Sequence, residues 1–561
     1  MKASGANKLL SSLLDLGVNT VFGYPGGAVL PIYDAMVNFP EFKHILARHE
    51  QGAAHAADAF ARASGKVGVC LATSGPGATN IITGLATAMM DSVPLLALTG
   101  QVPSNLVGTD AFQEIDTFGL SIPVTKHSYF IERTEDIPHV IKEAIWLAQE
   151  GRPGPVLIDF PKDLLSKEIE FPDEPITART DFRYPYQGSE DELKEACRLL
   201  SEAKRPVLYV GGGAKGAFEE IRDISKKLNV PVTSTLMALG TMEDDDPLFM
   251  GMPGMHGTER ANMALYESDV ILAIGTRFDD RVTGDIKQFS PNSTKIQIDN
   301  DIYELGKLTP VAVRLAGDAQ IVLQELKKHL TPSTHDKWQT HLNDYTDYPP
   351  VEGAYPDSKV SPEKFFKVLR SALPKDAHVV TDVGQHQMWC AQYLSYYFPG
   401  SFITSGGLGT MGFGVPAALG ARMGSGDRMV VGIVGDGGFQ MTCQELSTIA
   451  RYNIPVKLII LDNACLGMVR QWQELFHGQR YSEVDLSDNP DFVKLSECYR
   501  IPAKRMDKNE NLEDELQQFL FSEGPSLLHV LITEHQNVYP IVPPGAAPHK
   551  MMTPPQTQEI K

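Results

Sequence analysis

Short apolar runs that end in glycine recur along the chain, separated by stretches of mixed polarity that are typical of helices. Residues 429–434 and 456–462 are two such runs, and Gly435 directly follows the first. Residues 67–77 and 93–99 repeat this arrangement near the start of the chain. Each pair predicts a strand, a glycine turn, a helix and a second parallel strand. The pattern therefore predicts an α/β fold built from doubly wound parallel sheets.

Two stretches at residues 166–190 and 331–361 break this pattern and are predicted to be linkers; the second contains Tyr348-Pro-Pro350 and Tyr355-Pro356. The similar strand and turn spacing in the first and last parts of the chain predicts two related folds that form a site between them. Further strand-to-glycine runs predict a third α/β domain in the middle. The expected units are a first domain at 1–165, a central domain at 190–330, a third domain at 362–540 and a polar tail at 541–561.

Composition removes several classes of function. The formal net charge of −20 argues against nucleic acid as a partner. No apolar run approaches the ~18 residues that a membrane-spanning helix needs. The six cysteines show no CxxC spacing, so neither a disulfide framework nor a zinc site is expected. The first residues match no signal or transit peptide, which predicts a cytoplasmic protein.

The most informative motif is Gly435-Asp436-Gly437, followed after 25 residues by Asn463. Both polar side chains are expected at the carboxyl ends of neighbouring parallel strands, where open α/β sheets bind ligands. Carboxylate and amide oxygens suit Mg²⁺, which proteins commonly hold together with phosphate oxygens. The glycines allow backbone N–H groups to approach such a phosphate. The run resembles the diphosphate-binding motif of thiamine-diphosphate enzymes.

Glu50 is the candidate acid–base residue. It opens a predicted helix that is rich in alanine, where a carboxyl group would be poorly solvated and its pKa raised. The same position also suits an ordinary glutamate stabilised by the helix dipole. A zinc site is not expected, because His49-Glu50 lacks a second histidine at HExxH spacing.

Motifs along nearly the whole chain resemble the catalytic (large) subunit of acetohydroxyacid synthase, also called acetolactate synthase. The matching runs are 22–27 (FGYPGG), 48–53 (RHEQGA), 73–80 (TSGPGATN), 110–114 (DAFQE), 154–163 (GPVLIDFPKD), 384–389 (GQHQMW), 405–412 (SGGLGTMG), 466–472 (LGMVRQW) and 537–540 (NVYP).

This resemblance implies roles at the thiamine site. Glu50 would activate the pyrimidine ring, and Asp436 and Asn463 would bind Mg²⁺ with the main-chain carbonyl of Cys465. Met411 would support the bent cofactor; taken alone it would be core filler. Trp472 would narrow the acceptor site beside Met468 and Val469. Residues matching positions near the reacting carbons are Gly27, Phe112, Gln113 and Lys162, and further positions expected to bind the cofactor are Gly384, Gln385, His386, Gly409, Gly435, Gly437, Gly438 and Met468.

The resemblance also implies a bound FAD in the central domain, with a structural rather than a redox role. The run RFDDR at 277–281 and the segment at 254–257 are the matching features. A glycine turn after a strand is by itself only a weak dinucleotide signal. The expected FAD contacts are Arg152, Gly211, Gly212, Gly213, Met255, His256, Arg277, Asp279, Asp280, Arg281, Asp299 and Asp318.

The implied reaction is decarboxylation of pyruvate and transfer of the two-carbon unit to pyruvate or 2-ketobutyrate, which opens branched-chain amino acid biosynthesis. The implied assembly is a homodimer or homotetramer with a small regulatory subunit. A pyruvate oxidase or 2-ketoacid decarboxylase would use the same cofactor, but decarboxylases carry adjacent histidines where this chain has Phe112-Gln113. A nucleotide-binding protein without turnover is disfavoured by the set Glu50, Asp436 and Asn463.

Three positions depart from the family pattern. Asp462 precedes Asn463 where the family usually has Asn-Asn, and Asp462 would either add charge near the metal or cap the turn. Residue 465 is Cys, of which only the carbonyl is needed. Ile122 stands where many members carry Arg, a change expected to alter loop contacts near the site.

Overall fold

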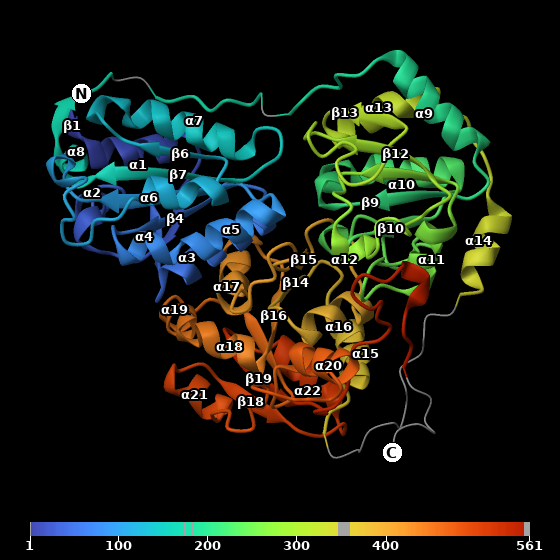
Figure 1. Ribbon diagram of the computed structural model, residues 1–561. Coiled ribbons are helices and arrows are strands. Elements are labelled where there is room, and N and C mark those ends of the chain that lie inside the picture. The colour runs from blue at the N-terminus through green and yellow to red at the C-terminus, as the bar shows by residue number, and fades with distance from the viewer. Residues whose placement is uncertain (1, 173–174, 182, 346–358, 555–561) are drawn as a thin grey trace.

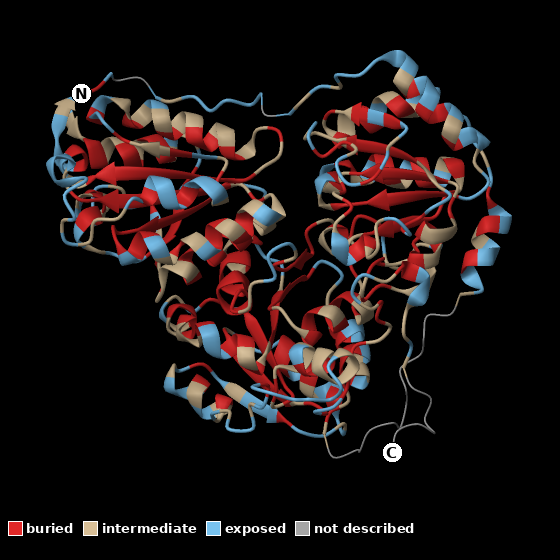
Figure 2. Ribbon diagram, viewed as in Figure 1, coloured by how far each residue is buried: buried red, intermediate tan, exposed pale blue. Residues whose placement is uncertain are grey.

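The computed structural model describes residues 2–172, 175–181, 183–345 and 359–554. Three parallel sheets form three α/β units, coloured blue, green to yellow, and orange to red in Figure 1. The third unit lies below the other two and contacts both. Figure 2 shows the strands buried and the outer helix faces exposed, as expected for sheets covered by helices.

The first sheet has the order β3-β2-β4-β5-β7-β6, with helices on both faces. Successive residues of β4 point to opposite faces, so Val69 and Leu71 enter one apolar core and Cys70 and Ala72 another. The elements are β2 (Thr20–Gly23), β3 (Lys43–Leu46), β4 (Gly68–Ala72), β5 (Leu95–Gln101), β6 (His127–Phe130), β7 (Pro155–Pro161), α1 (Gly5–Asp15), α2 (Leu30–Met36), α3 (Glu50–Ser64), α4 (Pro76–Asn80), α5 (Ile82–Asp91), α6 (Thr117–Ser121), α7 (Ile137–Gln149) and α8 (Lys162–Ser166).

The central sheet has the order β10-β9-β11-β12-β13, and all its pairs are parallel. Its elements are β9 (Pro206–Val210), β10 (Val232–Ser234), β11 (Val270–Ile274), β12 (Thr294–Asp299), β13 (Val313–Ala316), α9 (Glu190–Glu202), α10 (Phe218–Leu228), α11 (Glu259–Glu267), α12 (Asp280–Thr283), α13 (Ala319–His329) and α14 (Asp336–Asn343).

The third sheet has the order β15-β14-β16-β17-β19-β18, which is the same topology as the first sheet. The two related folds predicted from the sequence are therefore present. The elements are β14 (His378–Thr381), β15 (Phe402–Ile403), β16 (Val430–Gly435), β17 (Lys457–Asp462), β18 (Ala503–Met506), β19 (Ser526–Leu531), α15 (Pro362–Ala372), α16 (Gln385–Tyr393), α17 (Gly414–Gly424), α18 (Asp436–Thr442), α19 (Leu446–Arg451), α20 (Gly467–Phe476), α21 (Phe492–Cys498) and α22 (Leu512–Leu520).

Helix α3 joins the first and third units by packing against α17. A Cβ on Gly420 would lie 1.9 Å from the carbonyl oxygen of Ala56, so the backbones approach closely only because both faces carry small residues. The alanines of α3 and α17 belong to one buried apolar cluster. The alanine-rich pattern of α3 thus serves contact between domains.

The predicted linkers and tail are more structured than expected. The first linker contains β8 (Glu168–Glu170), which pairs with β1 (Lys2–Ser4). The second contains α14, whose buried Trp338 donates a hydrogen bond from Nε1 to the carbonyl of Pro206, 3.1 Å away. Its Tyr348-Pro-Pro350 and Tyr355-Pro356 segments lie outside the described residues.

The tail is not a free polar extension, because its described part returns to the central domain. Val542 donates from its backbone N–H to the carbonyl of Met255, and Asp285 N–H donates to the carbonyl of Ala546. Ile541, Val542 and Ala547 are buried. All six cysteines are free thiols. No helix within the described ranges is long and apolar enough to cross a membrane.

Candidate active site

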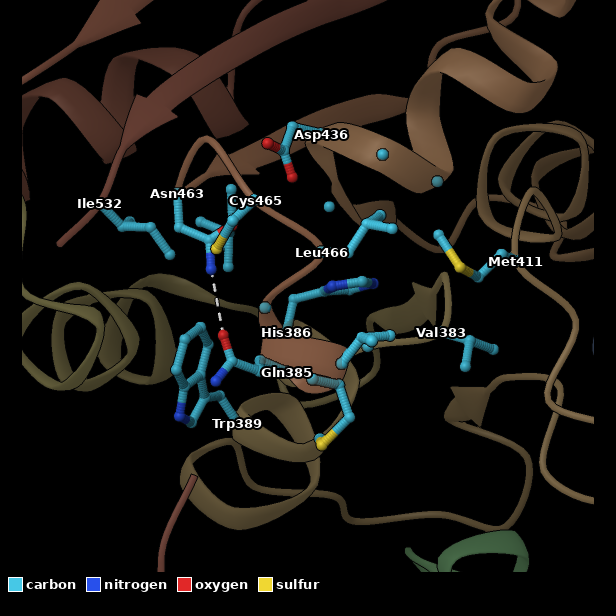
Figure 3. A pocket seen from close by; sticks show the side chains of 18 residues that line it. Val383, Gln385, His386, Trp389, Met411, Asp436, Asn463, Cys465, Leu466 and Ile532 are labelled. Carbon is cyan, nitrogen blue, oxygen red and sulfur yellow. Dashed lines mark hydrogen bonds between the residues drawn. The ribbon is translucent and has the colours of Figure 1, made fainter. Parts of the chain in front are cut away.

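A pocket opens at the carboxyl edge of the third sheet, beside β14, β16 and β17 (Figure 3). From β14 the chain passes to β15 on one side and then returns to β16 on the other, so the pocket lies at a topological switch point. The residues lining it are Val383, Gly384, Gln385, His386, Trp389, Met411, Gly435, Asp436, Gly437, Gly438, Leu461, Asn463, Cys465, Leu466, Gly467, Met468, Val469 and Ile532.

Asp436 and Asn463 follow the neighbouring strands β16 and β17, and both are buried. Asn463 donates from Nδ2 to Oε1 of Gln385 at 3.0 Å, which leaves its own amide oxygen available (Figure 3). Asn489 donates from Nδ2 to Oδ2 of Asp436 at 2.9 Å. The arrangement offers one carboxylate and one amide oxygen in a nearly dry setting.

The electrostatics of these groups suit a divalent cation. Burial and the neighbouring Asp462 carboxylate raise the pKa of Asp436 to about 7, and a bound cation would relieve both effects. No cluster of three or more His, Cys, Asp or Glu side chains suited to a metal occurs within the described residues. A cation held by Asp436 and Asn463 would take its further ligands from backbone, water or phosphate oxygens, which is the usual manner of Mg²⁺.

Both carboxylate oxygens of Asp462 lie within hydrogen-bond distance of groups of the protein itself. Its Oδ1 accepts the N–H of Ala464 at 2.9 Å, so the turn-capping alternative raised by the sequence applies. Its Oδ2 lies 2.8 Å from Nε2 of His529. Burial would raise the pKa of Asp462, but these hydrogen bonds hold the pKa below its usual range. Asp462 thus remains a charged neighbour of Asp436.

The glycine turns pack closely against the side chains beside them. A Cβ on Gly435 would lie 3.0 Å from Nδ1 of His386, and one on Gly438 would lie 2.4 Å from Oδ1 of Asp382. His386 is buried, its Nε2 has no hydrogen-bond partner within the described residues, and burial lowers its pKa to about 4. An unpartnered ring nitrogen above bare backbone fits an incoming polar ligand.

Met411 lies against this turn, 3.6 Å from the position of a Cβ on Gly437. Buried Asp382 holds its loop by accepting the N–H groups of Gly412 at 3.0 Å and Gly414 at 2.8 Å. Gly409 has a φ of +70° and is exposed, and it does not line the pocket. Met411 therefore lines the pocket, whereas Gly409 serves the bend of the loop.

Helix α20 forms another part of the pocket wall. Met468 and Val469 line the pocket from its first turn. Trp472, one turn further on, does not line the pocket and packs edge-on against Phe476 with ring centroids 5.7 Å apart. Within one chain, Trp472 therefore stands outside the wall formed by its neighbours.

Glu50 and the four residues expected near the reacting carbons all lie on the first domain, and none of them lines the pocket. Glu50 accepts a hydrogen bond from Nδ2 of Asn80 at 3.0 Å, and a Cβ on Gly77 would lie 3.4 Å from its Oε1. Its side chain is only partly buried in one chain, which differs from the poorly solvated setting expected. Gly27 is exposed, and the Thr73 hydroxyl accepts the N–H of the next residue, Ala28.

The loop after β5 carries Phe112 and Gln113. Phe112 is 88 % exposed, and Gln113 has a φ of +62°. Glu114 holds the loop in shape, because its carboxylate accepts the N–H groups of Gly108, Thr109 and Ala111. Lys162 begins α8 directly after β7, which pairs with β5. Glu50, Gln113 and the residues on either side of Gly27 thus lie around the turn at 73–77.

The central domain repeats the plan of a nucleotide-binding edge. Gly211, Gly212 and Gly213 follow β9, and Gly275 follows β11. A Cβ on Gly211 would lie 2.2 Å from the carbonyl of Gly275, so the turns fit only without side chains. The buried hydroxyls of Thr233 and Ser234, at the end of β10, and of Thr276, just after β11, have no partners among the described residues. Such orphaned hydroxyls fit a dinucleotide such as FAD.

The other predicted FAD residues lie on the same edge. Arg277, Asp279, Asp280 and Arg281 follow β11; Met255 and His256 lie opposite, where Met255 N–H donates to the carbonyl of Arg281. His256 is buried with an unpartnered Nδ1, and burial lowers its pKa to about 4. The side chain of Asp318 caps α13 by accepting backbone N–H groups from its first turn.

Arg152 reaches this edge from the first domain. Its guanidinium lies 3.2 Å from Glu304 and 3.5 Å from Asp301. Asp299 ends the adjacent strand β12, and burial raises its pKa to about 6. Arg152 therefore joins the first and central domains at the edge predicted to bind FAD.

Sequence reasoning missed Asp382, Asn489 and His529, although each contacts a predicted site residue or its loop. Asp382 directly follows β14 and could have been found by the strand-end rule that identified Asp436. Asn489 and His529 reach the site through tertiary contacts that carry no local sequence signal.

The three sheets, the pocket beside Asp436 and the glycine edges together define the thiamine-diphosphate class of enzymes. The chain matches the families described as thiamine pyrophosphate enzyme N-terminal TPP binding domain at 3–120, central domain at 193–326 and C-terminal TPP binding domain at 382–530.

Similar proteins of known name indicate which thiamine-diphosphate enzymes this chain resembles. The large subunit of acetolactate synthase isozyme 2 from Escherichia coli is 46 % identical over 551 residues, covering 98 % of this chain and 99 % of that one. A probable acetolactate synthase large subunit from Methanocaldococcus jannaschii is 45 % identical, covering 99 % and 98 %. The acetolactate synthase of Arthrospira platensis is 46 % identical, covering 98 % of each. The chain belongs to the acetolactate synthase family.

Proposed function

We propose that this protein is a thiamine-diphosphate-dependent carboligase. It decarboxylates pyruvate and joins the two-carbon unit to a second 2-ketoacid, giving 2-acetolactate in branched-chain amino acid biosynthesis. The observation that carries the proposal is the buried pair Asp436 and Asn463 beside Met411, in a chain similar to acetolactate synthases along its whole length. The domain boundaries proposed are 1–165, 190–330 and 362–540, with the tail at 541–561.

The residues of the third domain would bind the cofactor. Asp436 and Asn463 would hold Mg²⁺, with the Cys465 carbonyl, against the diphosphate. Met411 would support the bent cofactor with its apolar side chain. When bound, thiamine diphosphate supplies the electron sink for loss of CO2 and the nucleophile for the ligation. The protein contributes orientation, exclusion of water and proton management.

The first domain would supply the acid–base group. Glu50 is already oriented by Asn80, and it would hold the proton exchanged at the pyrimidine ring nitrogen. Gly27, Gln113 and Lys162 would surround the reacting carbons. Because none of them lines the pocket of its own chain, we propose a homo-oligomer in which a second copy completes each site.

The exposed apolar surface of the first domain supports this assembly. Large exposed apolar patches mark interaction surfaces. The exposed large apolar residues near the turn at 73–77 and the loop after β5 are Tyr24, Leu30, Leu106, Val107, Phe112, Phe118, Leu120 and Ile122. A dimer or tetramer would cover them and would surround Glu50 with protein.

Further partners follow from the family. The names of two relatives describe them as large subunits, so we propose a small subunit as partner. FAD would occupy the central edge in a structural role, with its diphosphate over Gly211–Gly213. 2-Ketobutyrate is proposed as a second acceptor, selected by Trp472 once a neighbouring chain closes the site.

Product analysis tests the function. Purified protein with thiamine diphosphate, Mg²⁺ and FAD receives equal amounts of pyruvate and 2-ketobutyrate, beside a control without thiamine diphosphate. We expect 2-aceto-2-hydroxybutyrate and 2-acetolactate, with the former in excess. Acetaldehyde, acetate or acetyl phosphate as the main product would overturn the carboligase assignment while leaving the cofactor in place.

A further inference from the structure

The loop that carries Met411 is held by the first domain of the same chain. Residues 404–410 lead from β15 to Met411, and their contacts reach across the domain boundary. Asp91, at the end of α5, accepts the N–H of Gly406 at 3.0 Å and the N–H of Gly407 at 2.7 Å. Thr87, one turn earlier on α5, lies 2.8 Å from the hydroxyl of Thr410.

Asp91 is fixed in turn by a buried arginine. Arg62 of α3 donates from Nη2 to Asp91 at 2.9 Å, from Nε to Asp58 at 2.6 Å and from Nη1 to the Thr404 carbonyl at 3.0 Å. The side chains of Asp58 and Asp91 are fully buried, and that of Arg62 is 6 % exposed. Charge-assisted bonds in such a dry setting are strong and geometrically strict.

The central domain closes the same junction. A Cβ on Gly406 would lie 2.2 Å from Sδ of Met237. Lys215 lies close enough that burial and Arg62 lower its pKa to about 8. Asp382 holds the far end of the loop at Gly412 and Gly414. The segment beside Met411 is therefore fixed on one side by its own domain and on the other by Asp91.

We propose that Asp91 is a positioning residue for the cofactor: by holding Gly406 and Gly407 against the Arg62 pair, it sets the place of Met411 in the thiamine-diphosphate site. This inference rests on the proposed function of that site. Its consequence is that a residue of the first domain tunes cofactor affinity without touching the cofactor. The tie lies within one chain, so it is separate from any contribution of a second copy.

Asp58 provides a matched control. Asp91→Asn and Asp58→Asn each place an amide donor against the Arg62 guanidinium. Each variant therefore removes one of the two buried carboxylates that pair with Arg62. Only Asp91→Asn also removes an acceptor from the loop backbone. A merely structural role would make the two variants equal, whereas a positioning role separates them.

The experiment measures the Kd of thiamine diphosphate with Mg²⁺, by quenching of tryptophan fluorescence, together with the Tm of each apoprotein. We expect a comparable fall in Tm for both variants. We expect about 10-fold weaker binding for Asp91→Asn and a change within about twofold for Asp58→Asn, as typical for a residue that orients a binding group. Equal Kd values in the two variants would overturn the proposal.

Thr87→Val decides the matter if Asp91→Asn does not fold. Its hydroxyl already donates to the carbonyl of Thr83 at 2.9 Å, so it accepts from Thr410, and valine removes that bond with no charge exposed. We expect weaker cofactor binding, by about threefold, at unchanged Tm. An unchanged Kd for Thr87→Val would likewise contradict the tie. Wild-type protein that binds no thiamine diphosphate would instead refute the function proposed for the site.

Discussion

The first and third domains share one strand order, yet their carboxyl edges carry different chemistry. Thr73 follows β4 and Gln101 ends β5, and both form hydrogen bonds within their own domain, with the Ala28 N–H and with Asp159 respectively. After β16 and β17 stand Asp436 and Asn463, which face an open pocket. The same topology thus serves as a closed edge that presents Glu50 and as an open edge that receives a ligand.

Buried carboxylates show the difference most clearly. Burial raises the pKa of Asp159 and that of Asp436, each to about 7. Asp159 receives donors on both oxygens, from Thr99 at 2.6 Å and Gln101 at 3.1 Å. Asp436 receives a side-chain donor only from Asn489 among the described residues and has the Asp462 carboxylate as a neighbour. The hydrogen bonds of Asp159 are complete as folded, whereas Asp436 would be completed by the cation proposed for it.

The largest effects are expected from substitutions that disable the carboxyl edge of the first domain and that of the third domain separately. Glu50→Gln should lower kcat by about 1,000-fold, because a proton-transfer group is lost, while cofactor binding persists. Asp436→Ala should abolish Mg²⁺-dependent cofactor binding and lower activity by about 100-fold or more. Steady-state kinetics and the Kd of thiamine diphosphate check both. The exposed substitutions Glu41→Gln and Asp488→Ala serve as controls and should leave both quantities near wild type.

Mixing the two inactive variants sharpens the comparison. If each site takes Glu50 from one chain and Asp436 from another, half of randomly mixed dimers carry one intact site. Activity should then recover to about a quarter of wild type after joint unfolding and refolding. Failure of the mixture to recover, while refolded wild type does, would mean that each chain holds a complete site.

The sequence predicted the fold well because the fold follows from local periodicity. Apolar runs of strand length and glycine turns located β4, β16 and β17, and the shared spacing of two blocks indicated their common topology. The helix within the second linker and the contacts of the tail were not predicted. Helix α14 and the docked segment from Ile541 owe their places to tertiary contacts, with Pro206 and Met255 respectively, which no local pattern shows.

The candidate site likewise has one part that the sequence predicted and another part that depends on tertiary contacts. Asp436, Asn463, Met411 and the glycine turns come together as expected, since strand ends share one edge. The full solvation of Phe112 and the partial exposure of Glu50 could not be foreseen, because the contacts within one chain do not cover them. Asn489 was missed because it approaches from a loop 53 residues beyond Asp436.

A smaller effect is expected from Asn489, which orients Asp436 on the open edge. Asn489→Ala removes the donor to Oδ2 of Asp436, and residues that orient metal ligands contribute about 10-fold or more to metal affinity. We expect Mn²⁺, titrated by electron paramagnetic resonance in the presence of thiamine diphosphate, to bind about 10-fold more weakly. Ser487→Ala, on the same loop, is the control and should bind as wild type does. Equal affinities in the two variants would assign Asn489 to loop structure alone.

The smallest effect on chemistry is expected where the two related domains touch. Gly420→Ala would place a Cβ 1.9 Å from the carbonyl of Ala56, so α17 must move away from α3, at a cost of about 2 kcal/mol. Gly216→Ala is the matched control, because nothing lies within 4 Å of a Cβ there. Scanning calorimetry should show a lower Tm for Gly420→Ala only, and kcat should stay within about twofold of wild type, since neither edge carries its reacting groups on this contact. A large fall in kcat at an unchanged Tm would show instead that the packing of α3 on α17 sets the position of Glu50, and the two domains would then act as one catalytic unit within the chain.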